Sequence, residues 1–307
     1  MEKRKIGSLE VSAVGLGCNN FGRRLDAQAT QAVVDAAIEN GINFFDTADI
    51  YGGTKSEEFL GLALGKRRDK VVVATKFGAK VSEEKQGARP EYIRQAVEDS
   101  LKRLNTDHID LYQLHRPDDN VPIADTLGAL DELVKAGKVR EIGASNFSAD
   151  QLRRAETAVP AGAARFVSLQ NEYSLLDREY ESHVLPEAIK QHVAFLPYFP
   201  LANGLLTGKY RLGQAMPEGT RLKSDNELLS DNNLAIVESL MQFSQESGHT
   251  ILELAFSWLA SRPTVASVIA GATSAGQIES NAKAVNWKLS EADLAELDAI
   301  LARSATE

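Results

Sequence analysis

Four ionisable side chains stand at or just beyond the ends of apolar runs in this sequence. Asp46 ends the run "FFD", and Tyr51 follows it by five residues. Lys76 ends "VVVATK" and His115 ends "IDLYQLH". A tyrosine has an ordinary pKa of about 10, and a neighbouring lysine cation lowers this pKa because it favours the phenolate. An ion pair with Asp46 would keep Lys76 charged, and His115 could donate a hydrogen bond to a substrate oxygen. Such a set can protonate an alkoxide as it forms, and it needs a hydride-donating cofactor.

Each of these side chains also has an ordinary structural explanation when it is considered alone. Asp46 could cap the segment after its strand, Tyr51 could be an amphipathic rim residue, and His115 could be a satisfied core histidine. Lys76 is harder to explain in this way, because a lysine is seldom buried without a partner. Charged groups gathered in one apolar region of a protein are also costly for stability, since buried charges must be desolvated. The set as a whole therefore indicates chemistry.

The elements that must position these residues alternate along the chain. Short runs rich in Val, Ile, Phe and Leu are separated by longer segments of helical periodicity. Strands are predicted at Val14–Gly17, Asn43–Asp46, Val71–Lys76, Ile109–His115, Ile142–Ser145, Phe166–Gln170, Ala194–Tyr198 and Ser267–Gly271. Helices are predicted at Ala27–Asn40, Pro90–Leu104, Ile123–Ala136, Gln151–Thr157, Glu181–Gln191 and Ala275–Val285.

Eight strands, each followed by a helix, is the number that closes a (β/α)8 TIM barrel, so the predicted fold is α/β with residues 1–307 in a single barrel domain. A doubly wound sheet is the alternative, but "GLGCNNFG" lacks the glycine spacing that such a sheet carries after its first strand. Additions are predicted as a short N-terminal β-hairpin at Lys5–Val11, a long connection from Leu201 to Asn233, and extra C-terminal helices at 232–248 and 250–263. A connection of that length is more often functional than idle.

The barrel prediction makes a statement about chemistry. In such barrels the active site lies at the carboxyl ends of the strands. The polar residues at those ends are Asp46, Lys76, His115, Ser145 with Asn146, Gln170 and Tyr198. Tyr51 follows the second strand by a short loop and can fold back over the same mouth. We therefore expect these side chains to form one cluster.

Composition restricts the partners and the compartment. The formal net charge is -9 and no block of clustered Lys and Arg occurs, which argues against binding to nucleic acid. The single cysteine, Cys18, cannot form an internal disulfide, which fits a reducing compartment. No apolar stretch is long enough to span a bilayer and no signal core follows the N-terminus, so we expect a cytoplasmic protein with no membrane partner. No histidine has metal-ligand spacing, and no metal site is predicted.

Several ordered motifs together resemble the aldo-keto reductase family over nearly the whole chain. They are "GLGCNNFG", "FFDTADIYGGTKSEEFLG", "VVVATKFG", "DLYQLHRPD", "GKVREIGASNFS", "LQNEYSLLDRE", "PLANGLLTGKY" and "GATSAGQIESNAKA". The pair "LQNEYSLLDRE" and "GLLTGKY" is closer to the bacterial reductases and potassium-channel β subunits of the family than to its aldose reductase branch. The resemblance implies a catalytic tetrad of Asp46, Tyr51, Lys76 and His115, with Tyr51 as proton donor to a carbonyl oxygen. It also implies NADP(H), or NAD(H) in its place, bound extended across the barrel mouth.

The same resemblance assigns residues to the cofactor. They are Gly17, Cys18, Asn19, Asp46, Ser145, Asn146, Gln170, Tyr198, Phe199, Pro200, Leu201, Gly204, Lys209, Arg221, Gly271, Thr273, Gln277 and Asn281. In this assignment Ser145, Asn146 and Gln170 hold the nicotinamide carboxamide, and Tyr198 stacks on the ring. The substrate pocket would be formed by Asn19, Phe21, Tyr51, Phe77, His115 and Arg116.

Three departures from the family pattern concern the grip on the cofactor. Phe199 replaces a serine whose hydroxyl binds pyrophosphate in many members, and Ser280 stands where a glutamate is common. No Lys or Arg lies between Gly271 and Asn281, where one branch of the family has a cationic clamp for the 2'-phosphate. We still expect a preference for NADPH over NADH, because neutral hydroxyl and amide groups in this segment can hydrogen-bond a phosphate.

Two functions from different classes remain open at this stage. The first is a reductase of small-molecule aldehydes or ketones. The second is a cofactor-sensing regulatory barrel with little turnover, similar to the channel β subunits. An intact tetrad fits both functions, and the sequence assigns no oligomeric state.

Overall fold

The computed structural model describes residues 1–218, 220, 222–223 and 225–303. Its strands are β1 (Lys3–Ile6), β2 (Leu9–Ser12), β3 (Val14–Gly17), β4 (Phe44–Asp46), β5 (Val72–Phe77), β6 (Ile109–Leu114), β7 (Val139–Ser145), β8 (Phe166–Glu172), β9 (Ala194–Tyr198) and β10 (Val268–Gly271). Its α-helices are α1 (Ala27–Glu39), α2 (Lys55–Leu64), α3 (Pro90–Leu104), α4 (Ile123–Lys135), α5 (Ala149–Ala158), α6 (Val184–Lys190), α7 (Asp231–Glu246), α8 (Ile251–Ala260), α9 (Ala275–Lys283) and α10 (Glu291–Arg303). Short 3-10 helices cover Gly65–Lys70, Glu179–Glu181, Ala202–Thr207 and Glu227–Leu229.

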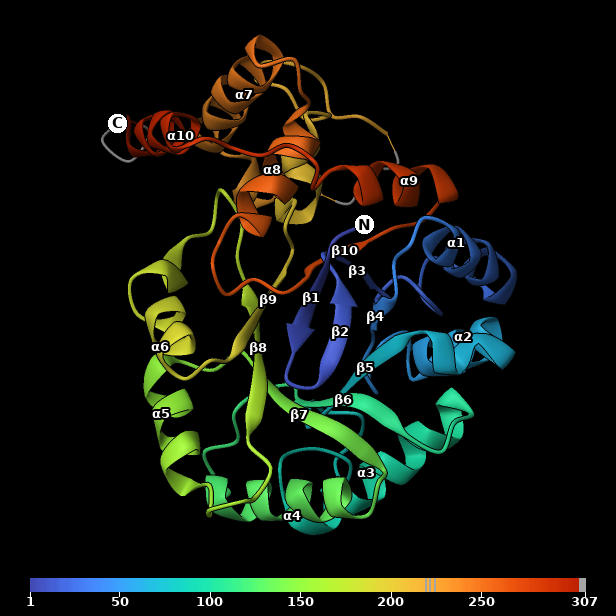
Figure 1. Cartoon of the computed structure of the whole chain (residues 1–307). Coiled ribbons are helices and arrows are strands. Elements are labelled where there is room, and N and C mark those ends of the chain that lie inside the picture. The colour runs from blue at the N-terminus through green and yellow to red at the C-terminus, as the bar shows by residue number, and fades with distance from the viewer. Residues whose placement is uncertain (219, 221, 224, 304–307) are drawn as a thin grey trace.

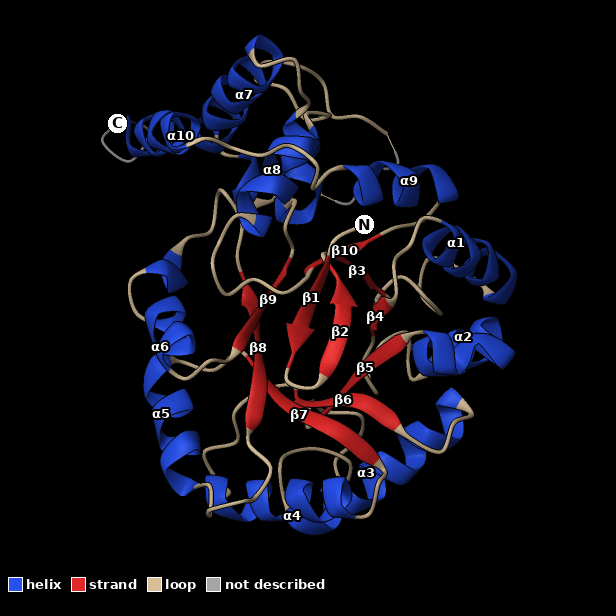
Figure 2. Ribbon diagram, viewed as in Figure 1, coloured by secondary structure: helices blue, strands red, loops and turns tan. Residues whose placement is uncertain are grey.

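Eight parallel strands form a nearly closed barrel in the order β10-β3-β4-β5-β6-β7-β8-β9. The two end strands are joined just before β10, where the Phe195 amide donates to the Thr264 carbonyl over 2.7 Å and the Ala266 amide donates to the Phe195 carbonyl over 3.0 Å. Helices surround the strands on the outside (Figure 1, Figure 2). The predicted α/β barrel is confirmed.

The N-terminal hairpin closes the amino end of the barrel. β1 and β2 pair antiparallel and lie across the opening of the strand ring (Figure 1). Ile6, Leu9 and Val11 are buried in one cluster with barrel residues that include Phe44 and Leu111. With this end filled by apolar side chains, the carboxyl ends of the strands are left to form the site.

Local signals explain why the ring helices begin and end where they do. Pro90 stands at the start of α3, where its missing amide hydrogen costs nothing, and Asn105 ends the helix in a left-handed conformation with φ 51°. Ser148 and Gln151 form a capping box at the start of α5. These elements match the predicted helices closely.

Two differences from the predicted helices are informative. The helix α2 was not among the predicted helices, and it begins without a side-chain cap, because Thr54 adopts φ 78° and its side chain makes no capping bond. Of the two helices between β9 and β10, α8 packs against the barrel as a ring helix does, and α7 packs against α10 outside the ring (Figure 1). None of the helices in the described part of the chain is both long and apolar enough to cross a bilayer.

Candidate active site

The centre of the site is an ion pair between two buried side chains. Asp46 ends β4, and Lys76 lies near the end of β5, the neighbouring strand. The Lys76 ammonium donates to Asp46 Oδ2 over 2.6 Å and to the Thr47 carbonyl over 2.8 Å. Burial works to lower the pKa of Lys76, but Asp46 and Tyr51 outweigh it and raise the pKa above its ordinary value. Lys76 is therefore charged at neutral pH.

The other carboxylate oxygen of Asp46 is held by two amide side chains. Gln170 of β8 donates to Oδ1 over 2.9 Å, and Gln113 of β6 donates to it over 3.3 Å. Both glutamines are buried. Asp46 is thus fixed at both oxygens and cannot rotate away from Lys76. One amide donor of Gln170 is committed to this task.

Tyr51 lies in the loop between β4 and α2, next to the ion pair. The Lys76 ammonium is 5.1 Å from the centroid of the Tyr51 ring. Burial raises the pKa of Tyr51 above its ordinary value, while the charge of Lys76 acts to lower it and that of Asp46 to raise it. The lysine thus acts in the direction predicted from the sequence, but burial outweighs it. Tyr51 keeps its proton at neutral pH, as a proton donor must.

His115 follows β6 and faces Tyr51. The two rings meet edge to face, with their centroids 5.8 Å apart. Burial, together with the charges of Lys76 and Arg116, lowers the pKa of His115 to about 3, so the imidazole is neutral at physiological pH. Its Nδ1 atom is buried with no hydrogen-bond partner among the described residues. Such an atom needs a partner that these residues do not supply.

A chain of hydrogen bonds extends the polar wall to the ends of β7, β8 and β9. Ser145 Oγ donates to the Gln170 carbonyl over 2.7 Å. The Asn146 side-chain amide donates to Ser145 Oγ over 3.0 Å and to the His115 carbonyl over 2.9 Å. The Tyr198 hydroxyl donates to Asn146 Oδ1 over 2.8 Å. These bonds fix the orientation of the wall before any ligand arrives.

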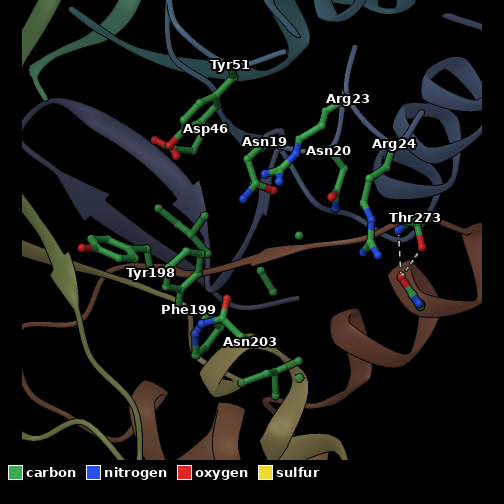
Figure 3. Close-up of a pocket in the computed structure, with 18 of the residues that line it drawn as sticks. Asn19, Asn20, Arg23, Arg24, Asp46, Tyr51, Tyr198, Phe199, Asn203 and Thr273 are labelled. Carbon is green, nitrogen blue, oxygen red and sulfur yellow. Dashed lines mark hydrogen bonds between the residues drawn. The ribbon is translucent and has the colours of Figure 1, made fainter. Parts of the chain in front are cut away.

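The wall belongs to one large cavity at the carboxyl ends of the strands (Figure 3). Its volume is about 1230 Å³, above the roughly 300–1,000 Å³ typical of pockets for drug-sized ligands. The predicted site residues in its lining are Gly17, Asn19, Asp46, Tyr51, His115, Arg116, Ser145, Asn146, Gln170, Tyr198, Phe199, Pro200, Leu201, Gly204, Lys209, Gly271, Thr273, Gln277 and Asn281. Residues far apart in the sequence therefore meet at one site.

Two aromatic residues predicted for the substrate pocket lie elsewhere. Phe21 and Phe77 are fully buried in the core and are not among the residues that line the cavity. Phe77 follows Lys76 in β5, and successive side chains of a strand point to opposite faces. Because Lys76 points into the barrel, Phe77 points outward, where its ring stacks on Tyr112 with centroids 4.7 Å apart. We therefore leave both phenylalanines out of the pocket.

Cys18 and Arg221 complete the predicted set. Cys18 is buried and is not among the residues that line the cavity, and its backbone amide donates to the Asp46 carbonyl over 2.8 Å. Burial raises the pKa of the Cys18 thiol well above its ordinary value, so the thiol stays protonated and unreactive. Arg221 lies outside the described residues.

The segment after β9 forms another wall of the cavity. Its backbone turns through left-handed conformations at Phe199 (φ 52°), Ala202 (φ 44°), Asn203 (φ 57°) and Gly204 (φ 100°). Leu205 is fully buried and anchors this segment to the core. Non-glycine residues in such conformations cost free energy and cluster at ligand clamps. The long connection predicted as functional thus begins as part of the cavity wall.

Helix α9 begins beside the opposite wall. Ser274 caps it by accepting from the Gln277 amide over 3.3 Å, and Gln277 Oε1 accepts from the Thr273 amide over 2.7 Å. Asn281 is buried further along the helix. Free amide groups at a helix start favour a negatively charged group.

Several polar residues in the lining were missed in the sequence analysis. They are Asn20, Arg23, Arg24, Asn203, Thr207 and Ser274. For the arginines a signal existed, because "CNNFGRR" directly follows the first predicted barrel strand and so had to lie at its carboxyl end.

The lining fits an extended nucleotide with phosphate groups. Asn19 Oδ1 is buried without a partner among the described residues. A Cβ atom on Gly271 would lie 3.2 Å from Asn19 Oδ1, and one on Gly204 would lie 3.0 Å from Lys209 Nζ. Glycine at these two places leaves room for a ligand to approach the backbone closely. The amide, hydroxyl and cationic groups around them suit a dinucleotide.

Comparison with known proteins identifies the family. The sequence model of the aldo/keto reductase family matches residues 13–302. A probable aldo-keto reductase 1 from Glycine max is 35% identical over 306 residues, covering 95% of this chain and 87% of that protein. A probable voltage-gated potassium channel subunit beta from Arabidopsis thaliana is 34% identical, covering 93% of this chain and 92% of that protein.

A solved structure agrees with this result. The glycerol dehydrogenase AKR11B4 from Gluconobacter oxydans superposes with a TM-score of 0.87 at 30% sequence identity, covering 99% of this chain and 96% of that one. The uncharacterized oxidoreductase YrpG from Bacillus subtilis is 36% identical over 307 residues, covering 94% of this chain and 92% of that protein. This chain therefore belongs to the aldo/keto reductase family of oxidoreductases.

Proposed function

We propose that this protein is an NADP(H)-dependent oxidoreductase that reduces the carbonyl of an aldehyde or ketone to an alcohol, with Tyr51 as the proton donor. The observation that carries the proposal is the buried Lys76–Asp46 ion pair, whose ammonium lies 5.1 Å from the centroid of the Tyr51 ring. A fold gains little from burying two charges beside a phenol, since their desolvation offsets their attraction. Proton transfer from that phenol explains why the arrangement is present.

Tyr51 acts by giving its phenolic proton to the carbonyl oxygen as negative charge develops there. The charged Lys76 beside the ring stabilises the phenolate that remains. Asp46, held by Gln170 and Gln113, keeps Lys76 charged and in place. The three side chains therefore form one proton-donating unit, with Tyr51 as its reacting member.

His115 orients the carbonyl group. Because burial and two nearby cations keep its imidazole neutral, it offers a hydrogen bond to the substrate oxygen without competing as an acid. Its edge-to-face contact with Tyr51 keeps the two groups at one substrate atom. Protonation is thus left to Tyr51.

NADPH, when bound, supplies the hydride that the reduction requires. The nicotinamide carboxamide would be held by Ser145, Asn146 and Gln170, with Tyr198 against the ring and Gly17 and Asn19 near its ribose. The pyrophosphate would be bound by the segment of Phe199, Pro200, Leu201, Gly204 and Lys209. The adenosine end would be bound by Gly271, Thr273, Gln277 and Asn281. The tetrad then lies at the nicotinamide end of the cavity.

The substrate pocket that we propose contains Asn19, Tyr51, His115 and Arg116. The two phenylalanines predicted for this pocket, Phe21 and Phe77, are buried in the core, whereas the exposed cation Arg116 remains in the lining. A small polar or anionic aldehyde or ketone suits this lining better than a large aromatic one, because no aromatic side chain other than Tyr51 and His115 is assigned to it.

A second candidate function rests on one observation, the 34% identity with the probable channel subunit beta from Arabidopsis thaliana. In that case the barrel would bind the same nucleotide and act mainly as a sensor, with little turnover. The tetrad is compatible with both functions.

A fluorescence titration with NADPH and with NADH, followed by a panel of aldehydes and ketones, separates the candidates. Tight binding with turnover supports the reductase. Tight binding with no turnover across the panel supports the sensor. A chain that binds neither nucleotide contradicts both.

We also propose that residues 1–307 act as a single barrel domain located in the cytoplasm. The one cysteine of the chain is a buried free thiol, which a reducing compartment preserves. The partner we propose is a small-molecule carbonyl compound, with neither nucleic acid nor a membrane as a ligand. The net charge of -9 supports the exclusion of nucleic acid.

A further inference from the structure

We infer that Arg23 and Arg24, in the loop between β3 and α1, are the phosphate clamp of the dinucleotide, and that Arg24 is the residue that selects the 2'-phosphate of NADPH. Both arginines line the cavity, and both side chains are exposed to it or to solvent. The inference rests on the proposed function, because it requires a nicotinamide dinucleotide in this cavity. The inference adds a cationic contact at the adenosine end of the cavity, where the sequence analysis identified only neutral groups.

The loop is rigidly built, so the arginines are held at the cavity mouth. The carbonyl of Asn20 accepts from the amides of Arg23, Arg24 and Leu25 over 3.2, 2.8 and 3.0 Å. Gly22 has φ 71°, and a Cβ atom there would lie 2.4 Å from the Cβ of Lys55. The loop is therefore packed against the start of α2 with no space to shift.

In this loop the apolar side chains are buried and hold the loop to the core, whereas the arginine side chains are exposed. Phe21 and Leu25 are buried on either side of the two exposed arginines. The phenylalanine that we removed from the substrate pocket thus has a structural task, which is to hold the loop that carries the arginines. A loop fixed at both ends places its cations with little loss of conformational entropy on binding.

The Asn20 side chain ties this loop to the segment after β10, the strand next to β3 in the ring. Its amide donates to the Ala272 carbonyl over 3.3 Å, and the residue is only 8% exposed. Ala272 immediately precedes Thr273, which leads into α9. The arginine loop and the start of α9 are therefore held side by side at the adenosine end of the cavity.

The charge balance of the cavity favours an anionic ligand. Among the described residues of its lining, the cationic ones are Arg23, Arg24, Arg116 and Lys209, and the one carboxylate is Asp46, already paired with Lys76. No acidic partner for Arg23 or Arg24 occurs in the described part of the chain. A guanidinium group presents several donors in one plane, which suits the oxygens of a phosphate. In a chain with a net charge of -9, these cations concentrate positive charge at the ligand.

The two arginines point to different parts of the cavity. In Figure 3 the Arg24 guanidinium extends toward the side where Thr273 lies, and the Arg23 guanidinium extends toward Asn19. The Thr273 side is where we propose the adenosine end, and no Lys or Arg lies between Gly271 and Asn281 to neutralise a 2'-phosphate there. Arg24 supplies that charge from the neighbouring loop. Arg23 faces the middle of the cavity, where the pyrophosphate common to NADPH and NADH would lie.

Fluorescence titrations of the full chain with NADPH and with NADH test this assignment. The variant Arg24→Gln removes the charge and keeps a side chain of similar reach. We expect it to weaken NADPH binding by roughly ten- to a hundredfold, as for the loss of one charge-assisted hydrogen bond, with NADH binding unchanged. The variant Arg24→Lys keeps the charge and should restore part of the NADPH preference.

Arg23→Gln is the matched control in the same loop. It should weaken NADPH and NADH by similar factors, because the pyrophosphate is present in both, and leave their ratio unchanged. Far-UV circular dichroism checks that each exposed substitution leaves the fold intact.

The outcomes separate this inference from the proposed function. If the unmodified chain binds NADPH and NADH equally, or if Arg24→Gln keeps the original ratio, the inference is overturned and the reductase proposal stands. A changed ratio in Arg23→Gln with none in Arg24→Gln also overturns the assignment. If the unmodified chain binds neither nucleotide, the proposed function fails and the inference fails with it.

Discussion

Gln170 and Asp46 are joined by a hydrogen bond of 2.9 Å that crosses the barrel interior from β8 to β4. These strands are four places apart in the ring of eight, so the bond connects opposite sides of the barrel. It holds the carboxylate oxygen that Lys76 does not contact. The orientation of the ion pair therefore depends on a strand far away in the sequence.

This bond gives a first prediction. Gln170→Leu leaves Asp46 Oδ1 with only the longer bond from Gln113, and we expect the free energy of unfolding to fall by about 1–3 kcal/mol, the cost of a lost bond to a buried charged group. Urea denaturation measures the change. Gln113→Leu is the control and should cost less, because its bond is 3.3 Å long. A larger loss for Gln113→Leu than for Gln170→Leu would contradict the ranking.

A second prediction concerns the ion pair itself. Lys76→Met keeps the length of the side chain and leaves the Asp46 carboxylate buried without its counter-ion, which we expect to cost about 3–5 kcal/mol in the free energy of unfolding. Adding Asp46→Asn to this variant removes the unpaired charge and should recover part of the loss. If the double variant lost as much free energy of unfolding as the two single variants together, Lys76 and Asp46 would not be coupled in the way we describe.

The same substitution should shift the pH dependence of catalysis. Lys76 is the group that acts to lower the pKa of Tyr51, so Lys76→Met should move the alkaline limb of the pH profile of carbonyl reduction, where Tyr51 loses its proton, to higher pH. Rates measured between pH 6 and about pH 11 give the profile, within the ordinary range of a tyrosine. An unmoved profile would remove the lysine from the proton-donating unit.

The neutral His115 leads to a third prediction. Its pKa of about 3 means that its ring carries no charge between pH 5 and about pH 8, although an ordinary histidine changes charge there. In ¹⁵N-detected NMR its ring signals should stay at neutral values over this interval. A His115 signal that titrated near pH 6 would show that the imidazole protonates in the working range.

A fourth prediction comes from Asp49, a buried residue of the loop that carries Tyr51. Burial, and then the charge of Glu57, raises the pKa of Asp49 to about 7, while Arg103 and the Tyr92 hydroxyl act against this. The raised pKa means that the folded state holds a proton that the unfolded state gives up near pH 4. The stabilisation is complete below about pH 4 and is lost as the pH rises through about 7, with a slope of at most about 1.4 kcal/mol per pH unit.

Asp49→Asn tests this linkage. Asparagine cannot ionise, so the free energy of unfolding of the variant should vary less between about pH 4 and pH 7 than that of the parent chain. Urea denaturation at four pH values in this interval measures both slopes. Equal slopes in the two proteins would show that Asp49 titrates normally in the folded state.

Much of the barrel was predictable from sequence because strands and ring helices carry strong local signals. The strand Val14–Gly17 and the helix Pro90–Leu104 were predicted with the bounds that the structure has. The clustering of Asp46, Lys76 and His115 followed from one rule about strand ends. The helices α2 and α10 were not among the predicted helices. At α2 the sequence T-K-S-E has the pattern of a capping box that the structure does not form, since Thr54 makes no capping bond. At α10 the signal is formed, because Ser290 and Asp293 cap each other.

The details of the site depended on contacts between distant elements. That Gln170 donates to Asp46 is a property of the closed barrel and of no local pattern. The position of Phe77 was predictable in principle, since strand alternation excludes it from the face that Lys76 occupies. Phe21 is different, because its burial depends on how the loop after β3 packs against α2.

The most direct test of the central claim is a comparison of Tyr51→Phe with the parent chain, in NADPH binding and in carbonyl reduction. Phenylalanine keeps the ring beside Lys76 and removes only the hydroxyl. We expect the dissociation constant for NADPH to stay within about twofold and the turnover of carbonyl substrate to fall by about 10²–10⁴-fold, the usual contribution of a general acid. Unchanged turnover in Tyr51→Phe, with NADPH bound as before, would contradict the assignment of Tyr51 as the proton donor.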